Sequence, residues 1–162
     1  MSVAFTREED SEAAAADLPD RPVSAHPNLV TPEGLAQLEA GLEAARAAYA
    51  AAQSDTQGEG VSADRTAMAR ATRDLRYYGA RRASAQLMAP PADASQVAFG
   101  STVTFEREDG RTQRFRIVGE DEADPAAGSV SYLAPLARAL LGKAVGDLAQ
   151  LPGGEVEITA IE

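Results

Sequence analysis

The sequence has no cysteine and no tryptophan, and only eight of its 162 residues are aromatic, four tyrosines and four phenylalanines. Without cysteine the chain can form neither disulfide bonds nor thiolate metal sites, which fits a reducing compartment. It also lacks an apolar run near the roughly 18 residues that cross a bilayer, and its N-terminus carries acids where a signal peptide needs bases. These absences predict a soluble, cytoplasmic protein.

The charge is strongly unbalanced, with a net charge of −10. Much of it lies in residues 1–20, which hold one base, Arg7, and six acids: Glu8, Glu9, Asp10, Glu12, Asp17 and Asp20. This balance argues against duplex nucleic acid as the main partner, because phosphate binding needs a basic face, and it suits a basic protein surface or channel. Residues 1–28 also have almost no large apolar side chains, so we expect a disordered acidic tail there.

Residues 29–89 have the pattern of an antiparallel coiled-coil hairpin. Thr31, Pro32 and Glu33 are a typical helix start, with a hydroxyl cap, a proline at the first helical position and an acid in the first turn. Seam positions then alternate at spacings of three and four on both sides of a polar break at 54–60: Leu35, Leu38, Leu42, Ala45, Tyr49 and Ala52, then Met68, Ala71, Leu75, Tyr78, Arg82 and Ala85. Two helices of an ordinary bundle are the alternative, but no further long helical segment exists to complete one.

Residues 90–96 are interpreted as a linker, and residues 97–162 as a small antiparallel sheet with one short helix. Strand patterns lie at 97–105, 115–118, 129–133, 148–151 and 155–161, with a turn at 108–110. Gly100 is a candidate bulge. A helix of about two turns is expected at 134–143, opened by a proline and closed by a glycine. The chain as a whole is therefore expected to be α+β.

Several segments of the C-terminal region occur in an order and spacing that identify a family: Gly100–Val103, Phe115–Gly119, Glu122–Asp124, Gly128, Ser131, Pro135–Lys143, Gly146–Asp147 and Pro152–Gly154. With these segments the chain resembles the GreA/GreB family of bacterial transcript-cleavage factors. Looser similarity at Leu29–Gly34 and Leu75–Leu87 extends the resemblance over about 29–162. It implies an FKBP-like fold for 97–162 that docks on RNA polymerase at the rim of the secondary channel, with the coiled coil inserted into that channel.

The resemblance also implies which residues contact the polymerase. The candidates are Asp121, Glu122, Asp124, Ser131, Arg138 and Lys143. Three acids within four residues are tempting as metal ligands, but we interpret them as a solvated turn that makes contacts. The chain is expected to be a monomer, without membrane association or sequence-specific DNA binding, and in indirect contact with nascent RNA. It is not expected to be an enzyme or to hold a cofactor of its own, acting at most with Mg²⁺ in the polymerase active centre.

The tip of the hairpin departs from the family pattern. Cleavage-competent members carry an aspartate followed three residues later by glutamate, asparagine, alanine, glutamate and tyrosine, whose carboxylates help to hold a second magnesium ion. This sequence offers only Asp55, Glu59 and Asp64 at its tip, and its hairpin looks shorter than usual. We therefore expect a factor that modulates elongation rather than a standard cleavage factor.

Three other functions stay open at this point. The tip acids Asp55, Glu59 and Asp64 can in principle stimulate cleavage. An FKBP-like fold also suggests a prolyl isomerase, although such a site needs an aromatic-lined pocket and the chain has few aromatic residues. A coiled-coil interaction module with a partner other than polymerase is the third alternative.

Overall fold

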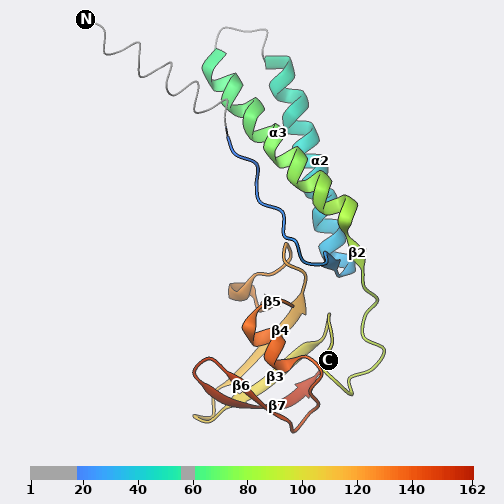
Figure 1. Cartoon of the computed structure of the whole chain (residues 1–162), viewed down its shortest axis with the longest axis vertical. Coiled ribbons are helices and arrows are strands. Elements are labelled where there is room, and N and C mark those ends of the chain that lie inside the picture. The colour runs from blue at the N-terminus through green and yellow to red at the C-terminus, as the bar shows by residue number, and fades with distance from the viewer. Residues whose placement is uncertain (1–17, 56–60) are drawn as a thin grey trace, which may run out of the picture. The chain divides into compact units, whose positions relative to one another are not determined.

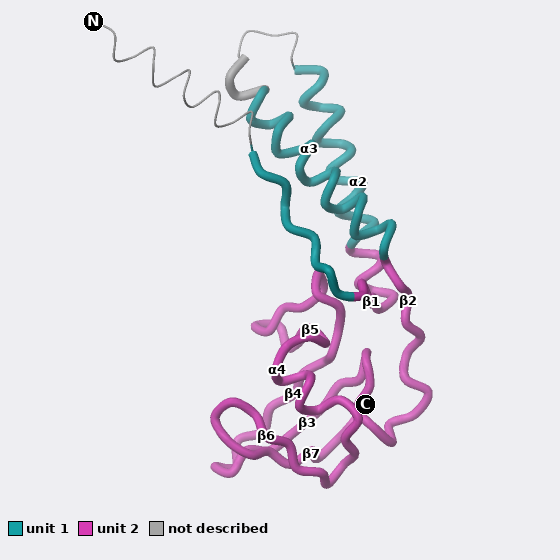
Figure 2. The backbone as a smooth tube through the Cα atoms, viewed as in Figure 1, with its two compact units in different colours: residues 1–26, 38–84 teal, residues 27–37, 85–162 magenta. Residues whose placement is uncertain are grey.

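The computed structural model describes residues 18–55 and 61–162, with the side chains of 61–64 excepted. The chain divides into two compact units (Figure 2): unit 1 comprises Met1–His26 and Leu38–Ser84, and unit 2 comprises Pro27–Gln37 and Ala85–Glu162. The boundaries expected from the sequence differ, because they kept 29–89 in one domain and began the next at 97. Residues 27–37 belong with the sheet domain since their tertiary hydrogen bonds go to it, for example from Tyr132 to the carbonyl of Pro27.

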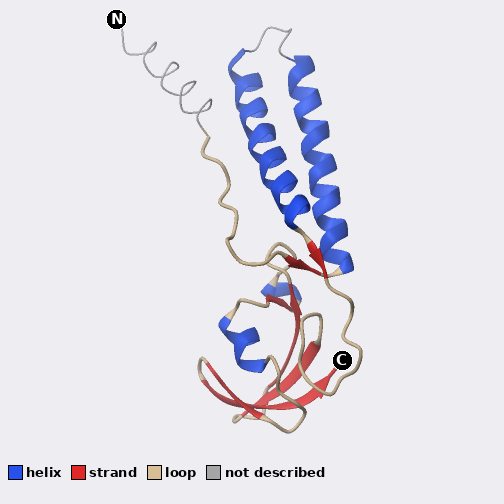
Figure 3. Ribbon diagram, turned by 45° about the vertical axis from the view of Figure 1, so that its right-hand side comes forward, coloured by secondary structure: helices blue, strands red, loops and turns tan. Residues whose placement is uncertain are grey.

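Unit 1 contains the predicted antiparallel hairpin. Helix α2 runs over Pro32–Asp55, beginning in unit 2, and α3 runs over Val61–Ser84, with the two helices side by side (Figures 1 and 3). The seam is confirmed at its centre, where Leu38, Ala45, Ala52 and Ala71 are buried. It differs at the end of α3. Arg82 is exposed there and its guanidinium forms an ion pair of 2.9 Å with Glu39, whereas Arg81 is buried.

The extended segment 18–26 also belongs to unit 1, although composition placed it in a disordered tail. Asp20 accepts a hydrogen bond of 3.1 Å from Arg76, and Arg21 donates one of 3.3 Å to Asp74. The Arg21 guanidinium lies 3.8 Å from the centroid of the Tyr77 ring. The lack of large apolar side chains did not predict the order of this segment correctly, because ion pairs and a cation–π contact attach it to α3. Residues 1–17 of the expected tail lie outside the described residues.

Unit 2 contains a five-stranded sheet in the order β5-β4-β3-β7-β6. Its strands are β3 (Thr102–Arg107), β4 (Thr112–Val118), β5 (Ser129–Ser131), β6 (Leu148–Leu151) and β7 (Gly154–Ile161). The pairs β3–β4, β3–β7 and β6–β7 are antiparallel as expected, but β5 runs parallel to β4. The sheet is therefore mixed, because the β4–β5 connection, which includes the short 3-10 helix η1 (Pro125–Ala127), returns the chain to the same end.

Two local predictions for this sheet need correction. The irregularity in β3 lies between Thr104 and Phe105, where the pairing with β7 shifts, and not at Gly100. Gly100 precedes β3 with a positive φ of 89°, so it serves a turn. A two-residue parallel pair of β1 (Leu29–Val30) and β2 (Gln86–Leu87) was not predicted either, because so short a strand leaves no periodic pattern.

The conventional core lies in unit 2, as the distribution of large apolar residues predicted. Helix α4 (Pro135–Leu140) covers the sheet with its buried residues Ala137 and Leu140. The core consists of Val97, Val103, Phe105, Ile117, Val130, Ala137, Leu140, Ala149, Leu151, Val156, Ile158 and Ile161. Across the described part of the chain, no helix combines the length and apolar character needed to span a membrane.

Candidate functional site

The connection between β4 and β5 carries the three acids proposed to contact a partner. Glu122 points inward, with its side chain only 9% exposed, and accepts a hydrogen bond of 2.6 Å from the Thr31 hydroxyl. The same hydroxyl accepts a hydrogen bond of 3.0 Å from the backbone N–H of Gly34 and so caps α2. Glu122 is thus engaged inside unit 2.

A small charge network surrounds this bond. Arg116 lies 3.3 Å from a carboxylate oxygen of Glu33 and 3.9 Å from one of Glu122. The Glu33 carboxyl has a pKa below its ordinary value, mainly because its own backbone N–H bonds to the charged form and next because Arg116 is near. The network fixes the first turn of α2 against β4 within unit 2.

Asp121 and Asp124 are the acids of this connection that remain exposed. With Glu122 they line an open hollow of about 630 Å³, together with Gln37, Arg116, Val118, Ala123, Ala127, Gly128 and Ser129. The backbone N–H of Asp124 donates to the Ser129 hydroxyl, which braces the turn. The arrangement suits contact with a polar partner. Among the described residues no three acids or histidines are grouped so as to hold a metal ion.

The other docking candidates do not line this hollow. Ser131 is half-buried at the end of β5, where its hydroxyl accepts a hydrogen bond of 3.2 Å from the backbone N–H of Leu133. Arg138 is exposed on α4, and Lys143 follows that helix with its carbonyl bonded to the N–H of Val97. The six candidates therefore form one group of three on the β4–β5 connection and three scattered positions.

Only part of the predicted tip can be located. Asp55 is the last residue of α2 and is exposed. Glu59 lies outside the described residues, and Asp64 belongs to the first turn of α3 with its side chain not described.

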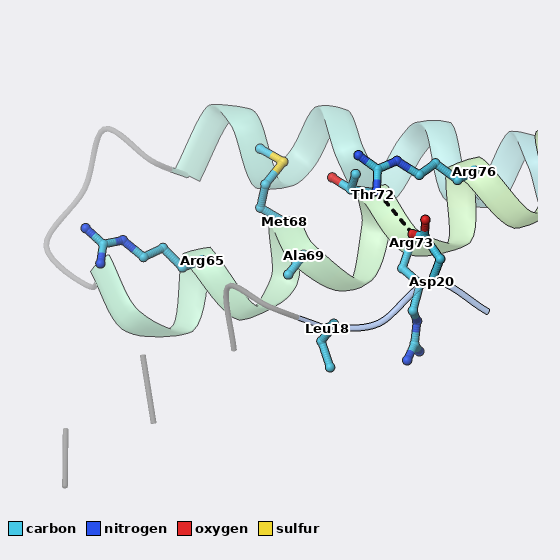
Figure 4. Close-up of a pocket in the computed structure, with 8 residues that line it drawn as sticks. All are labelled: Leu18, Asp20, Arg65, Met68, Ala69, Thr72, Arg73 and Arg76. Carbon is cyan, nitrogen blue, oxygen red and sulfur yellow. Dashed lines mark hydrogen bonds and ion pairs between the residues drawn. The ribbon is translucent and has the colours of Figure 1, made fainter. Parts of the chain in front are cut away.

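A second hollow, which the sequence did not predict, lies on α3 in unit 1. It has a volume of about 370 Å³ and is lined by Leu18, Asp20, Arg65, Met68, Ala69, Thr72, Arg73 and Arg76 (Figure 4). Figure 4 shows the N-terminal segment running beside α3 at this place, with Asp20 bonded to Arg76. The density of arginine in 61–84 is a signal of a basic surface, whereas the apolar seam of that helix predicts only its packing against α2.

Comparisons with known proteins agree on one family. Residues 92–162 match the family model described as "Transcription elongation factor, GreA/GreB, C-term". Transcription elongation factor GreB of Xanthomonas axonopodis pv. citri is 37% identical over 142 residues, which cover 78% of this chain and 84% of that protein. Transcription elongation factor GreA of Alkalilimnicola ehrlichii is 49% identical over 84 residues, 49% of this chain and 53% of that protein, so the match spans about half of that relative.

Solved structures with alignments over most of the chain carry related names. GreA factor homolog 1 (Gfh1) of Thermus thermophilus has a TM-score of 0.39 and 23% identity, covering 85% of this chain and 99% of that one. A GreA/GreB factor from Nitrosomonas europaea has a TM-score of 0.38 and 24% identity, covering 84% and 98%. The sequence match to GreB, which extends through both the hairpin and the sheet domain, decides the assignment: the chain belongs to the GreA/GreB family of transcription elongation factors.

Proposed function

We propose that this chain binds bacterial RNA polymerase in the cytoplasm and modulates elongation without acting as a standard transcript-cleavage factor. Membership in the GreA/GreB family supports the polymerase as partner. Unit 2 docks on the polymerase, and the exposed acids Asp121 and Asp124 beside the hollow contact basic groups there. The hairpin enters the secondary channel.

The claim that this chain is not a standard cleavage factor rests on the connection between α2 and α3. It consists of Thr-Gln-Gly-Glu-Gly, residues 56–60, where cleavage-competent members carry their acidic motif. A two-metal cleavage reaction needs carboxylates delivered to the metal, and a hard cation prefers several oxygen ligands. The isolated acids Asp55, Glu59 and Asp64 do not reproduce that motif. Each helix has 24 residues, or about 36 Å of length, with which to occupy a channel.

Transcript cleavage in a backtracked elongation complex tests the proposal. We expect the wild-type chain to bind the polymerase, slow elongation and compete with a cleavage-competent Gre factor, without stimulating cleavage. The variant Asp55→Ala/Glu59→Ala/Asp64→Ala should behave in the same way. Cleavage that the wild type stimulates and the triple variant does not would instead identify a cleavage factor with an unusual tip. Failure to recover polymerase in a pull-down would refute the proposal and favour a coiled-coil module with another partner.

A further inference from the structure

Helix α3 is strongly basic in an acidic protein. It carries six arginines and two aspartates, a net charge of +4, while the whole chain has −10. The arginines are Arg65, Arg70, Arg73, Arg76, Arg81 and Arg82. A helix with this density of one charge sign attracts anionic groups. A partner that binds α3 is therefore expected to be acidic.

The hollow on α3 concentrates three of these charges. We call the residues Arg65, Met68, Ala69, Thr72, Arg73 and Arg76 the arginine face. Nε of Arg73 is buried and makes no hydrogen bond among the described residues, with the carboxylate of Asp74 at 3.9 Å. A buried donor without an acceptor is unfavourable, so an additional acidic group at this face stabilises it.

The N-terminal segment already occupies one end of this face. Arg21 contacts Asp74 and Tyr77, Asp20 bonds to Arg76, and Leu18 is one of the residues that line the hollow (Figure 4). Traced backwards from residue 21 to residue 18, the segment thus runs toward Arg65 and the N-terminal end of α3. The residue that precedes Leu18 in the sequence is the acid Asp17.

Residues 1–17 have the charge and the length to continue along this path. They contain five acids and one base, a net charge of −4: Glu8, Glu9, Asp10, Glu12 and Asp17 against Arg7. Extended, they reach about 56 Å, whereas the distance along α3 from Arg76 to Val61 is about 22 Å. The N-terminal end of a helix also favours negative charge through its unpaired N–H groups.

We propose that residues 1–17 bind along the arginine face of α3, as a continuation of the contacts that residues 18–21 make. The attraction between the two charges of opposite sign holds the segment there. The proposal concerns unit 1 alone and does not depend on polymerase binding.

A spin label on the full-length chain tests the contact directly. Because the chain has no cysteine, Ser11→Cys gives one attachment site for a nitroxide, whose broadening of backbone amide signals reports nearby residues. We compare the native tail with a neutral tail, Glu8→Gln/Glu9→Gln/Asp10→Asn/Glu12→Gln/Asp17→Asn. A matched control neutralises five exposed acids of unit 2 instead and changes the net charge equally: Glu106→Gln, Glu108→Gln, Asp124→Asn, Glu155→Gln and Glu157→Gln.

We expect the broadening of the backbone amide signals of residues 61–76 to fall several-fold in the variant with the neutral tail. In the matched control this broadening should stay unchanged. Removing the other partner, with Arg65→Gln/Arg73→Gln/Arg76→Gln, should give the same loss. Raising NaCl from about 0.1 M to about 1 M shortens the screening length from about 10 Å to about 3 Å, so it should also reduce the amide broadening. Equal broadening with native and neutral tails, or broadening centred on unit 2, would overturn the proposal.

Discussion

The Thr31 hydroxyl donates a hydrogen bond of 2.6 Å to a carboxylate oxygen of Glu122, which lies 91 positions later in the chain. It accepts another of 3.0 Å from the backbone N–H of Gly34. One buried side chain therefore caps α2 and ties its first turn to the β4–β5 connection. An additional Cβ at Gly34 would lie 2.6 Å from the same Glu122 oxygen, so the Glu122 carboxylate would have to move to accommodate it.

Thr31→Ala should lower the free energy of unfolding by about 2–3 kcal/mol, because it removes a helix cap and leaves a largely buried carboxylate without that donor. Urea unfolding followed by circular dichroism measures the change. Thr31→Ser keeps the hydroxyl and is the matched control, with a loss of less than about 1 kcal/mol expected. If serine and alanine destabilise the protein equally, the methyl group of Thr31 and not its hydroxyl is what matters.

Gly119→Ala should also destabilise unit 2, but through a backbone clash. A Cβ at Gly119 would lie 2.3 Å from the carbonyl oxygen of Leu29, and a backbone atom cannot rotate out of the way. We expect a loss of about 1–3 kcal/mol, as for other overpacked sites. Hydrogen exchange should quicken at the amides of Gln86 and Met88, which bond to the carbonyls of Asn28 and Val30 on either side of Leu29. Unchanged protection of these amides would contradict the prediction.

The hairpin could be predicted because its signals are local. A hydroxyl cap, a three–four spacing and a polar break are all contained in the neighbouring sequence, and they located α2 and α3 within a few residues. The contacts of Thr31 with Glu122 and of Gly119 with Leu29 could not be predicted in this way. The two residues of each contact are far apart in the chain, and a periodic pattern does not predict which distant residues the fold brings together.

The same limit applies to the candidate site. The sequence identified three acids of the β4–β5 connection, Asp121, Glu122 and Asp124, but charged residues are usually exposed, so all three were assigned to the surface. The structure turns the Glu122 side chain inward, so that it is only 9% exposed, and leaves Asp121 and Asp124 exposed. Strand direction was missed for a related reason. The pattern of Ser129–Ser131 shows a strand, but whether it runs parallel to β4 depends on the path of the connection.

The hairpin also depends on a glycine where its helices meet. A Cβ at Gly41 of α2 would lie 2.5–2.8 Å from ring carbons of Tyr78 on α3, so the ring packs directly on the α2 backbone. Gly41→Ala should therefore destabilise the hairpin by about 1–3 kcal/mol, although glycine to alanine usually favours a helix. Gly79→Ala is the matched control, because nothing lies within 4 Å of its added Cβ, and it should stabilise the protein by about 0.5–1 kcal/mol. Thermal unfolding of both variants should show opposite shifts of Tm, and shifts of the same sign would contradict the prediction.

The turn between β3 and β4 should respond to acid. One carboxylate oxygen of Asp109 accepts a hydrogen bond of 3.0 Å from the backbone N–H of Arg111, and the other accepts one of 2.6 Å from its guanidinium. These bonds, the backbone one first, hold the pKa of the Asp109 carboxyl below its ordinary value. A lowered pKa means that the folded state favours the charged form. The resulting stabilisation is present above the ordinary pKa of about 4 and is lost as the pH falls through the lowered value.

Arg111→Gln should raise the pKa of Asp109 without returning it fully to the ordinary value, because the backbone N–H of residue 111 still donates. Titration of the Asp109 carboxyl carbon by NMR in the wild type and in Arg111→Gln measures both values. Asp109→Asn removes the titrating group, so its unfolding free energy should depend less on pH below about 4 than that of the wild type. An ordinary pKa for Asp109 in the wild type would show that neither bond persists in solution, and an identical pKa in the variant would assign the whole effect to the backbone.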